Sequence, residues 1–130
     1  THFLAGLGTS GTFMGTSRAL RQFNPNIKVM SFQPDSPFHG LEGLKHMETA
    51  MVPAIYDASL ADADLRVSTE DAHRCVRRLA REAGLMVGIS SGGALAATLQ
   101  FARTLERGVL VTVFPDGAEK YLTETFWTAE

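Results

Sequence analysis

Apolar residues in the first third of the chain follow two alternating patterns. Short apolar runs at residues 3–5 and 27–32 predict buried strands, and apolar side chains at helical spacing predict a helix over residues 12–23. Asn24 and Pro25 follow that helix and end it, because proline cannot continue a helix. This part of the chain is therefore predicted to fold as strand, helix, strand.

The segment from residue 35 to residue 64 interrupts this regularity. It contains Pro37, Gly40, Gly43 and Pro53, which are too many helix breakers for one long helix. Irregular segments of this length in a compact domain are usually functional or disordered. We therefore expect a loop with few regular elements here.

The second half of the chain returns to alternating strands and helices. Ser68 and Asp71 resemble a helix capping box, with Asp in place of the usual Glu or Gln, and Gly84 supplies a C-terminal stop. Cys75 lies on the apolar face of the helix between them, so we expect it to be buried and structural. The elements predicted in this half are strands at residues 65–67, 85–87 and 109–114, and helices at residues 69–83 and 94–105.

The order of these elements indicates the fold class. Strands that alternate with helices on both sides of an irregular segment are typical of an α/β fold, with an open, mostly parallel sheet and helices on both faces. A length of 130 residues with 45% hydrophobic content suits one such domain over residues 1–130.

Charge and cysteine content exclude several classes of protein. Twelve Lys and Arg residues against 14 Asp and Glu residues leave a net charge of −2, so there is no electrostatic footprint for nucleic acid. No stretch approaches the roughly 18 apolar residues of a membrane-spanning helix. The single cysteine excludes a disulfide framework and a cysteine-cluster zinc site, and it favours a reducing, cytoplasmic location. The four histidines show no pairing with glutamate that would suggest a metal site.

A glycine-rich turn follows the first predicted strand. Residues 6–11 match the pattern G-x-G-x-x-G and open a helix, whose unpaired N–H groups can bind an anion. The hydroxyls of Thr9, Ser10 and Thr12 favour a terminal phosphate over a bridging pyrophosphate. A dinucleotide site also needs an acidic residue at the end of the second strand, where this chain has Gln33 and Pro34. The alternative is a tight strand-to-helix connection that binds no ligand.

A second glycine-rich turn occupies residues 88–93, with Ser90 and Ser91 at its centre. These serines could serve only to cap the following helix, which is the common role of serine at such positions. Two turns at the carboxyl ends of parallel strands would converge on one crevice. A ligand with a phosphate at one end and a hydrogen-bonding ring atom at the other would fit between them.

Three motifs in order carry a resemblance to a known family. They are Gly-Thr-Ser-Gly-Thr at residues 8–12, Gly-Ile-Ser-Ser-Gly at residues 88–92 and Glu-Lys-Tyr-Leu at residues 119–122. Together they resemble the carboxyl-terminal half of cysteine synthase (O-acetylserine sulfhydrylase), of fold type II of the pyridoxal-phosphate enzymes. The resemblance covers essentially the whole chain and is closest to the B-type synthases.

The resemblance implies a pyridoxal 5'-phosphate site. In the family the first turn cradles the cofactor phosphate, and a serine matching Ser90 faces the pyridine nitrogen. Pro115 and Asp116 match the segment near the far side of the ring, although the family more often has a small polar residue where this chain has Asp116. The residues expected to hold the phosphate are Gly8, Thr9, Ser10, Gly11 and Thr12.

Residues 40–53 are similar to the mobile active-site segment of the family. Gly43 and Lys45 are expected to contact the substrate, with the Lys45 ammonium recognising an anionic group on the amino acid or on the sulfur donor. Lys45 could instead be a solvated loop charge. For His46 the solvated role is the expected one.

The chemistry of this family needs a lysine that forms a Schiff base with the cofactor and later acts as a general base. Lys28, Lys45 and Lys120 are the lysines of the chain, and none lies in the family's lysine motif, which precedes the first glycine turn. We therefore expect no catalytic residue here. The chain is predicted to be the carboxyl-terminal fragment of a two-domain enzyme that is inactive without its amino-terminal half.

The resemblance implies that the complete enzyme, a homodimer, replaces the β-substituent of an activated serine by a sulfur nucleophile through an aminoacrylate, making cysteine. Two alternatives remain open. One is a related enzyme of the same fold type, such as cystathionine β-synthase or a serine or threonine dehydratase. The other is a non-catalytic regulatory or interaction domain. The arginines at positions 74, 77, 78 and 81 are expected to form a solvated helix face rather than a partner surface.

Overall fold

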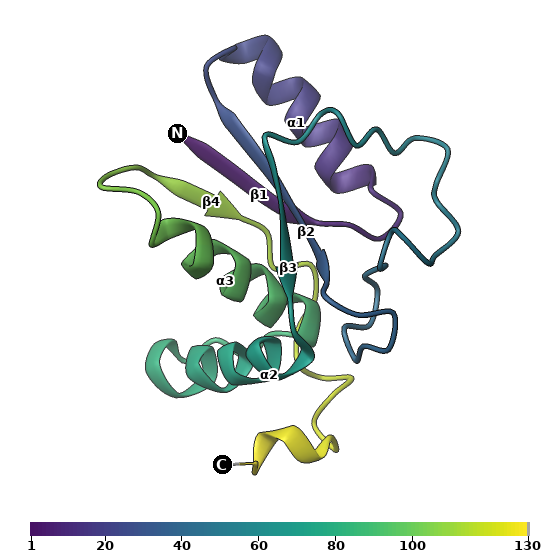
Figure 1. Ribbon diagram of the computed structural model, residues 1–130. Coiled ribbons are helices and arrows are strands. Elements are labelled where there is room, and N and C mark those ends of the chain that lie inside the picture. Colours follow the sequence, from purple (N-terminus) through teal and green to yellow (C-terminus); the bar gives the residue numbers. More distant parts are fainter. Residues whose placement is uncertain (130) are drawn as a thin grey trace.

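The computed structural model describes residues 1–129 (Figure 1). Its strands and helices follow the alternation that the sequence predicts. The strands are β1 (His2–Gly6), β2 (Lys28–Pro34), β3 (Ala63–Val67) and β4 (Leu110–Thr112). The helices are α1 (Gly11–Phe23), α2 (Thr69–Arg78), the π-helical turn η1 (Leu79–Ala83), α3 (Ile89–Ala102) and the 3₁₀ turn η2 (Thr125–Trp127).

The four strands form one parallel sheet in the order β3-β2-β1-β4. In this register Leu4 of β1 lies opposite Met30 of β2 on one side and Thr112 of β4 on the other. Helix α1 covers one face of the sheet, and α2 and α3 cover the other (Figure 1). The predicted fold class is confirmed, and the carboxyl ends of β1, β2 and β4 meet at one edge of the sheet.

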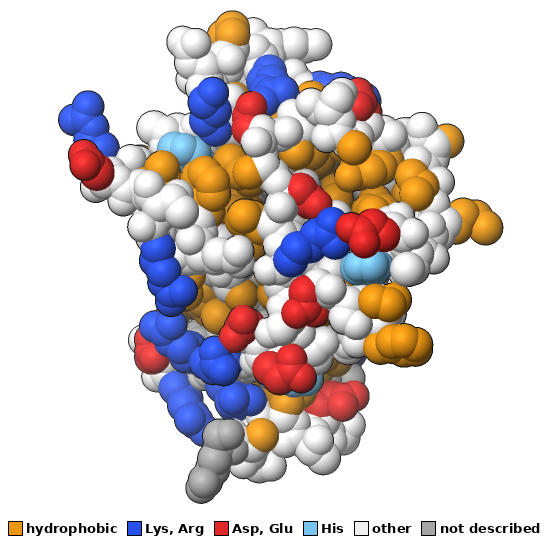
Figure 2. All heavy atoms as spheres, in the orientation of Figure 1, with side chains coloured by type: hydrophobic (Ala, Val, Ile, Leu, Met, Phe, Trp, Pro, Cys, Tyr) orange, Lys and Arg blue, Asp and Glu red, His pale blue; other side chains and the backbone are white. Residues whose placement is uncertain are grey.

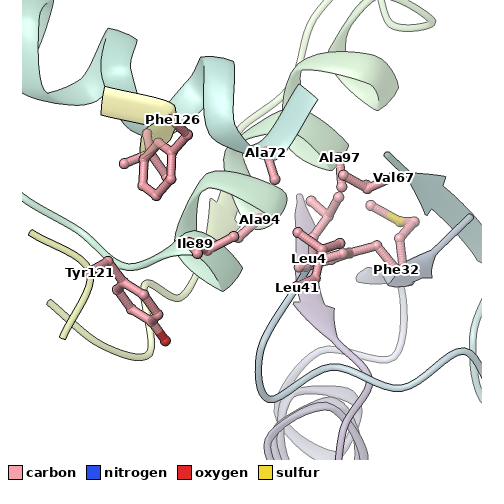
Figure 3. Close-up of a cluster of buried hydrophobic side chains, with 12 residues drawn as sticks. Leu4, Phe32, Leu41, Val67, Ala72, Ile89, Ala94, Ala97, Tyr121 and Phe126 are labelled. Atoms are coloured by element: carbon pink, nitrogen blue, oxygen red, sulfur yellow. The ribbon is translucent and has the colours of Figure 1, made fainter. Parts of the chain in front are cut away.

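Alternation along the strands divides the core into two layers. Phe3 and Val29 point toward α1 and pack with Phe13, whereas Leu4 and Phe32 point toward α3. Figure 3 shows the second layer, in which Leu4 and Phe32 of the sheet face Ala97 of α3. Burial on both faces explains why these strands are almost continuously apolar in sequence.

Helix α2 begins and ends where the sequence places its signals. The Ser68 Oγ accepts a hydrogen bond from the Asp71 N–H at 3.1 Å, as in a capping box. Gly84 closes the η1 turn in the left-handed conformation, with φ of 67°. Cys75 is buried against the rest of the fold as expected, and burial raises the pKa of its thiol.

Three predictions about regular elements are wrong. Residues 85–87 form no strand, since Val87 makes only an isolated bridge to Gly117 and Leu85 and Met86 are exposed. The last strand covers Leu110–Thr112 only, because the following residues turn away from β1. Helix α3 begins at Ile89, so residues 90–93 belong to its first turns and not to a loop.

The early start of α3 has a packing reason. A side chain at Gly92 would overlap the Ala72 carbonyl oxygen and the Val76 side chain of α2. Glycine in this position lets the two helices approach closely, and they make the most extensive contact between any two elements. The glycines that suggested a turn in the sequence therefore serve helix packing as well.

The outer face of α2 carries the arginine cluster, and blue side chains gather over this helix in Figure 2. Arg74 pairs with Asp71 and Arg78 pairs with Glu82, both at exposed positions. Arg77 donates to the Phe126 carbonyl oxygen at 2.7 Å and ties the C-terminal turn to α2. Within residues 1–129, no helix has the length and apolar character needed to cross a membrane.

Candidate functional site

A cavity of about 290 Å³ opens at the carboxyl ends of β1 and β2. Every residue that the sequence assigns to the cofactor lines it, from both glycine-rich segments and from the chain after β4. Gly43 lines it too, and Lys45 does not. The cofactor-assigned residues in its wall are Gly8, Thr9, Ser10, Gly11, Thr12, Ser90, Pro115 and Asp116.

The first glycine turn is held tightly between the sheet and the irregular segment. The Leu7 N–H donates to the Phe32 carbonyl oxygen at 2.9 Å, and the Lys45 N–H donates to the Leu7 carbonyl oxygen at 2.8 Å. A Cβ at position 8 would overlap the backbone oxygen of Gly43, so only glycine fits there. The turn is therefore locked in place by neighbouring backbone and not by its own side chains.

Ser10 is the most unusual residue of this turn. Its φ of 71° is the one positive value at a non-glycine position among the described residues. Its side chain is 1% exposed, and its Oγ has no hydrogen-bond partner. An unpaired buried hydroxyl destabilises a fold unless a ligand bonds to it. Together with the first N–H groups of α1, the Ser10 hydroxyl is a suitable donor for a bound phosphate.

The opposite wall is built by hydrogen bonds between the start of α3 and the chain after β4. The Asp116 carbonyl oxygen accepts from the Gly88 N–H at 3.1 Å and from the Ser91 Oγ at 3.3 Å. The Asp116 carboxylate lies against the Cα of Gly88, where any side chain would displace it. Neither serine caps α3, because Gly88 is the N-cap and makes no side-chain cap bond.

Asp116 and Tyr121 are polar residues that line this side of the cavity and contact each other. The Tyr121 hydroxyl donates to Asp116 Oδ2 at 3.2 Å, and Asp116 Oδ1 is buried without a partner. Burial and the neighbouring Asp116 carboxylate raise the pKa of Tyr121 to about 12, so this hydroxyl stays protonated at neutral pH. Tyr121 lies in the motif that carried the resemblance, but no pattern in the sequence assigns it a role.

Two charged residues at the cavity were missed from the sequence. Glu42 comes from the irregular segment and Lys120 from the C-terminal turn, and both are exposed. Glu42 stood beside the predicted Gly43 without any motif of its own. Lys120 belonged to the last motif of the resemblance, which could have identified it.

The positions of Lys45 and His46 differ from those expected from the sequence. The Lys45 Nζ donates to the Met51 carbonyl oxygen at 3.2 Å, outside the cavity lining. The prediction that His46 is a solvated residue is wrong, since its side chain is buried and its Nδ1 lies 2.8 Å from Thr49 Oγ1. At Met47 the segment is tied to β2, because the Met47 N–H donates to Oε1 of the buried Gln33 side chain at 2.8 Å.

Comparison with known proteins identifies a family whose cofactor has the phosphate and the ring that the cavity walls suit. Residues 1–116 match the family described as pyridoxal-phosphate dependent enzyme. The chain belongs to this family. The cavity residues lie within or directly after the matched region, and the cofactor of the family is pyridoxal phosphate.

Relatives within the family include two bacterial synthases. The chain is 53% identical to cysteine synthase from Aquifex aeolicus over 132 residues, which cover 98% of this chain and 40% of the relative. It is 41% identical to cysteine synthase B from Pseudomonas aeruginosa, covering 95% of this chain and 41% of the relative. The chain therefore spans about two fifths of the length of these relatives.

Solved structures share the fold over nearly the whole chain. O-ureido-L-serine synthase superposes with a TM-score of 0.88 at 32% identity, covering 98% of this chain and 43% of that structure. The O-acetylserine dependent cystathionine beta-synthase from Helicobacter pylori superposes with a TM-score of 0.87 at 34% identity, covering 98% and 44%. The predicted fold type II architecture is confirmed.

The cavity suits the cofactor of the family in its chemistry. One end offers hydroxyls, including the unpaired Ser10 Oγ, and the amino-terminal end of α1 for a phosphate. The other end offers the polar residues Ser90 and Asp116 for polar atoms of a ring. Aliphatic and aromatic side chains such as Phe32 and Leu44 lie between the two ends and suit the face of a flat ring. Among residues 1–129 no cluster of His, Cys, Asp or Glu could hold a metal ion.

Proposed function

We propose that this chain is the cofactor-holding, carboxyl-terminal portion of a pyridoxal-phosphate dependent cysteine synthase, a transferase that makes cysteine from an activated serine and a sulfur nucleophile. The observation that carries the proposal is the cavity whose two glycine-rich walls leave the Ser10 hydroxyl and one Asp116 oxygen buried and unpaired. The 53% identity to a cysteine synthase supports the choice of reaction within the family.

Each wall has a separate task in this proposal. The turn at residues 8–12 binds the phosphate through hydroxyls and backbone N–H groups. Ser90, Pro115 and Asp116 position the pyridine ring from the other side. When bound, the cofactor supplies an electron sink for bond changes at the β-carbon of an amino acid. The protein residues hold it rigidly and exclude water from one of its faces.

The covalent anchor is proposed to come from an amino-terminal half of the enzyme. Lys28 lies at the start of β2, at the opposite end of the strand from the cavity, and Lys45 is bound to the Met51 carbonyl oxygen. Lys120 lines the cavity but belongs to the last motif of the resemblance and not to the family's lysine motif. We therefore propose that the 130-residue chain alone does not catalyse the reaction, and that the complete enzyme is a cytoplasmic homodimer with two domains.

Gly43 and Lys45 are proposed to contact the substrate. Gly43 lies in the cavity wall with a φ of 89°, and it contacts Gly8 of the phosphate-binding turn. Lys45 follows two residues later, and its ammonium would have to leave the Met51 carbonyl oxygen to reach an anion in the cavity. Movement of residues 40–53 when substrate binds would allow this exchange.

The first test is binding of the cofactor to the chain itself. Pyridoxal phosphate is expected to raise the melting temperature, since a ligand at a hundredfold excess over its Kd stabilises the folded state by about 2.7 kcal/mol. Pyridoxal, which lacks the phosphate, is the matched control and should give a much smaller shift. Equal shifts with the two compounds, or no shift in a folded sample, would contradict the proposed phosphate-binding turn.

The second test concerns the reaction. A longer form of the protein that includes a lysine-bearing upstream segment is expected to form cysteine from O-acetylserine and sulfide, while the 130-residue chain forms none. In the longer form, Lys45→Ala should raise the KM for the anionic substrate or donor with little change in kcat. Turnover of threonine without cysteine formation would instead identify a dehydratase.

A further inference from the structure

Gln33 is a buried polar side chain near the carboxyl end of β2, and the proposed reaction gives it no task. It is 2% exposed, and its amide contacts two segments that are distant in sequence. Its Oε1 accepts a hydrogen bond from the Met47 N–H at 2.8 Å, and its Nε2 donates to Asp64 Oδ2. Gln33 therefore connects the irregular segment to the edge strand β3.

The chemistry of these two contacts requires an amide at this position. A backbone N–H can only donate, and a charged carboxylate can only accept. The side chain between Met47 and Asp64 must therefore accept at one end and donate at the other, which an amide does and a charged carboxylate cannot do. Asp64 is itself oriented by the Ser31 hydroxyl, which donates to its Oδ1 at 2.7 Å. The position of both ends of the Gln33 amide is thus determined by its partners.

Met47 is fixed by its side chain as well as by its N–H. The side chain is buried in the core layer between the sheet and α1, in the cluster that contains Leu7 and Phe13. The next residue, Glu48, is tied to β3, because Arg66 donates to its Oε1 at 2.8 Å. The chain is therefore held against the sheet at residues 47 and 48.

Residues 42–46 lie between this point and a second fixed point upstream. There Leu41 is buried in the core layer on the other face of the sheet, and the Gly40 N–H donates to Thr69 Oγ1 at 2.9 Å. Residues 42–44 line the cavity. The part of the irregular segment that faces the cavity is thus a short stretch held at both ends.

The same stretch supports the phosphate-binding turn. The Lys45 N–H donates to the Leu7 carbonyl oxygen at 2.8 Å, and the Gly43 carbonyl oxygen lies close to the Cα of Gly8. Both contacts are made by backbone atoms. They depend on where the stretch is held and not on which side chains it carries.

We propose that Gln33 is a positioning residue, which holds the downstream end of residues 42–46 through the Met47 N–H and thereby keeps the phosphate-binding turn in place. Movement of the segment when substrate binds is then confined to residues 42–46, and Met47 is its fixed end. The effect on cofactor binding rests on the proposed cofactor site, whereas the anchoring at Met47 depends on no ligand.

Replacing Gln33 by glutamate keeps the shape of the side chain and removes its donor. At pH 8 the Met47 amide of Gln33→Glu should exchange with solvent about tenfold faster than in the unmodified chain, because two charged carboxylates at hydrogen-bond distance repel each other. At pH 5 a proton shared between the introduced carboxylate and Asp64 replaces the donor, so slow exchange should return. Protection factors measured by hydrogen exchange and NMR correct for the intrinsic effect of pH.

Other charged and titratable groups near this contact are the same in both proteins. Arg66 Nε lies 3.6 Å from Asp64 Oδ2, and the Asp64 carboxylate contributes to raising the pKa of Tyr56. His46 Nε2 lies 3.8 Å from Glu48 Oε2. The unmodified chain, measured at both pH values, therefore accounts for the titration of these groups.

A reversed pair tests whether the hydrogen bond itself is responsible. In Gln33→Glu combined with Asp64→Asn the amide and the carboxylate exchange places, so the amide donates to the carboxylate, which still accepts from the Met47 N–H. The double variant should recover slow exchange at pH 8 and lose the pH dependence. Gln22→Glu, the same substitution at an exposed position of α1, is the matched control and should leave Met47 exchange unchanged.

A measurement on the unmodified chain does not depend on the folding of any variant. The Met47 amide should exchange more slowly than the Lys45 amide, because only Lys45 belongs to the stretch that moves. Equal rates would mean that the segment opens as one unit, and they would overturn the anchoring role.

Cofactor binding separates this inference from the proposed function. The affinity for pyridoxal phosphate should fall about tenfold in Gln33→Glu at pH 8 and recover in the double variant. Unchanged Met47 exchange in Gln33→Glu, or no recovery in the double variant, would overturn the anchor. Faster exchange with unchanged affinity would overturn its link to the phosphate-binding turn. Failure of the unmodified chain to bind the cofactor would overturn the proposed site, while the exchange rates still decide the role of Gln33.

Discussion

Replacing Gly92 by alanine is expected to lower the free energy of unfolding by about 2 kcal/mol or more, because overpacking a close contact costs roughly 1–3 kcal/mol and here the contacted atom is backbone. The added methyl group would overlap the Ala72 carbonyl oxygen and the Val76 side chain. The carbonyl cannot rotate away without breaking α2. Chemical denaturation of the chain in urea measures the change directly.

Gly15 is the matched control for this substitution. It lies in helix α1, and a Cβ built there has no neighbouring atom within 4 Å. Gly15→Ala should therefore raise the free energy of unfolding by about 0.5–1 kcal/mol, the usual gain when alanine replaces glycine inside a helix. If both variants shift stability in the same direction, the close approach of α2 and α3 does not explain the glycine at position 92.

Replacing Ser10 by alanine should affect stability and binding in opposite directions. Removal of a buried hydroxyl that has no partner is expected to stabilise the ligand-free chain by about 1 kcal/mol, since leaving such a group unpaired costs roughly 1–3 kcal/mol. The same change removes a phosphate donor and should weaken pyridoxal phosphate binding about tenfold. Thermal melting with and without the cofactor measures both effects in one experiment.

Ser17 provides the control for this pair of effects. Its Oγ is also buried without a partner, but it lies in the middle of α1 and not in the cavity wall. Ser17→Ala should stabilise the chain to a similar degree and leave cofactor binding unchanged. Weaker cofactor binding in Ser17→Ala would mean that the effect at Ser10 works through α1 as a whole. Unchanged binding in Ser10→Ala would remove this hydroxyl from the phosphate site.

The two predictions concern different uses of small residues. Gly92 is required by packing between helices, and its effect appears in the free energy of unfolding. Ser10 is unfavourable for the ligand-free fold in both its positive φ and its unpaired hydroxyl. Conformational strain and unpaired polar atoms of this kind are concentrated at binding sites, where a ligand compensates for them.

The cofactor-assigned residues were found from the sequence because they lie in contiguous motifs. A glycine-rich turn between a strand and a helix has a local geometry that depends little on the rest of the chain. Residues 8–12 and Ser90 therefore appear in the cavity wall where the pattern predicts them. The alternation of apolar strands with helices likewise predicts the parallel sheet. A strand that is buried on both faces leaves a clear apolar run in the sequence.

The contacts between distant segments were decided only by the tertiary structure. Residues 109–114 are apolar enough for a long strand, but pairing with β1 stops at Thr112 and the chain turns into the cavity. Lys45 has the charge of an anion-binding residue, but the fold of its segment brings its ammonium to the Met51 carbonyl oxygen.

The same distinction applies to the carboxylate of Asp116. The sequence predicted the fold class and the motif residues that line the cavity, because both follow from local pattern and short motifs. Only the tertiary structure placed Asp116 on Gly88, gave one of its oxygens to Tyr121 and left the other buried without a donor. The contact between Asp116 and Gly88 joins residues 28 positions apart, and no local sequence pattern predicts that a buried oxygen there lacks a donor.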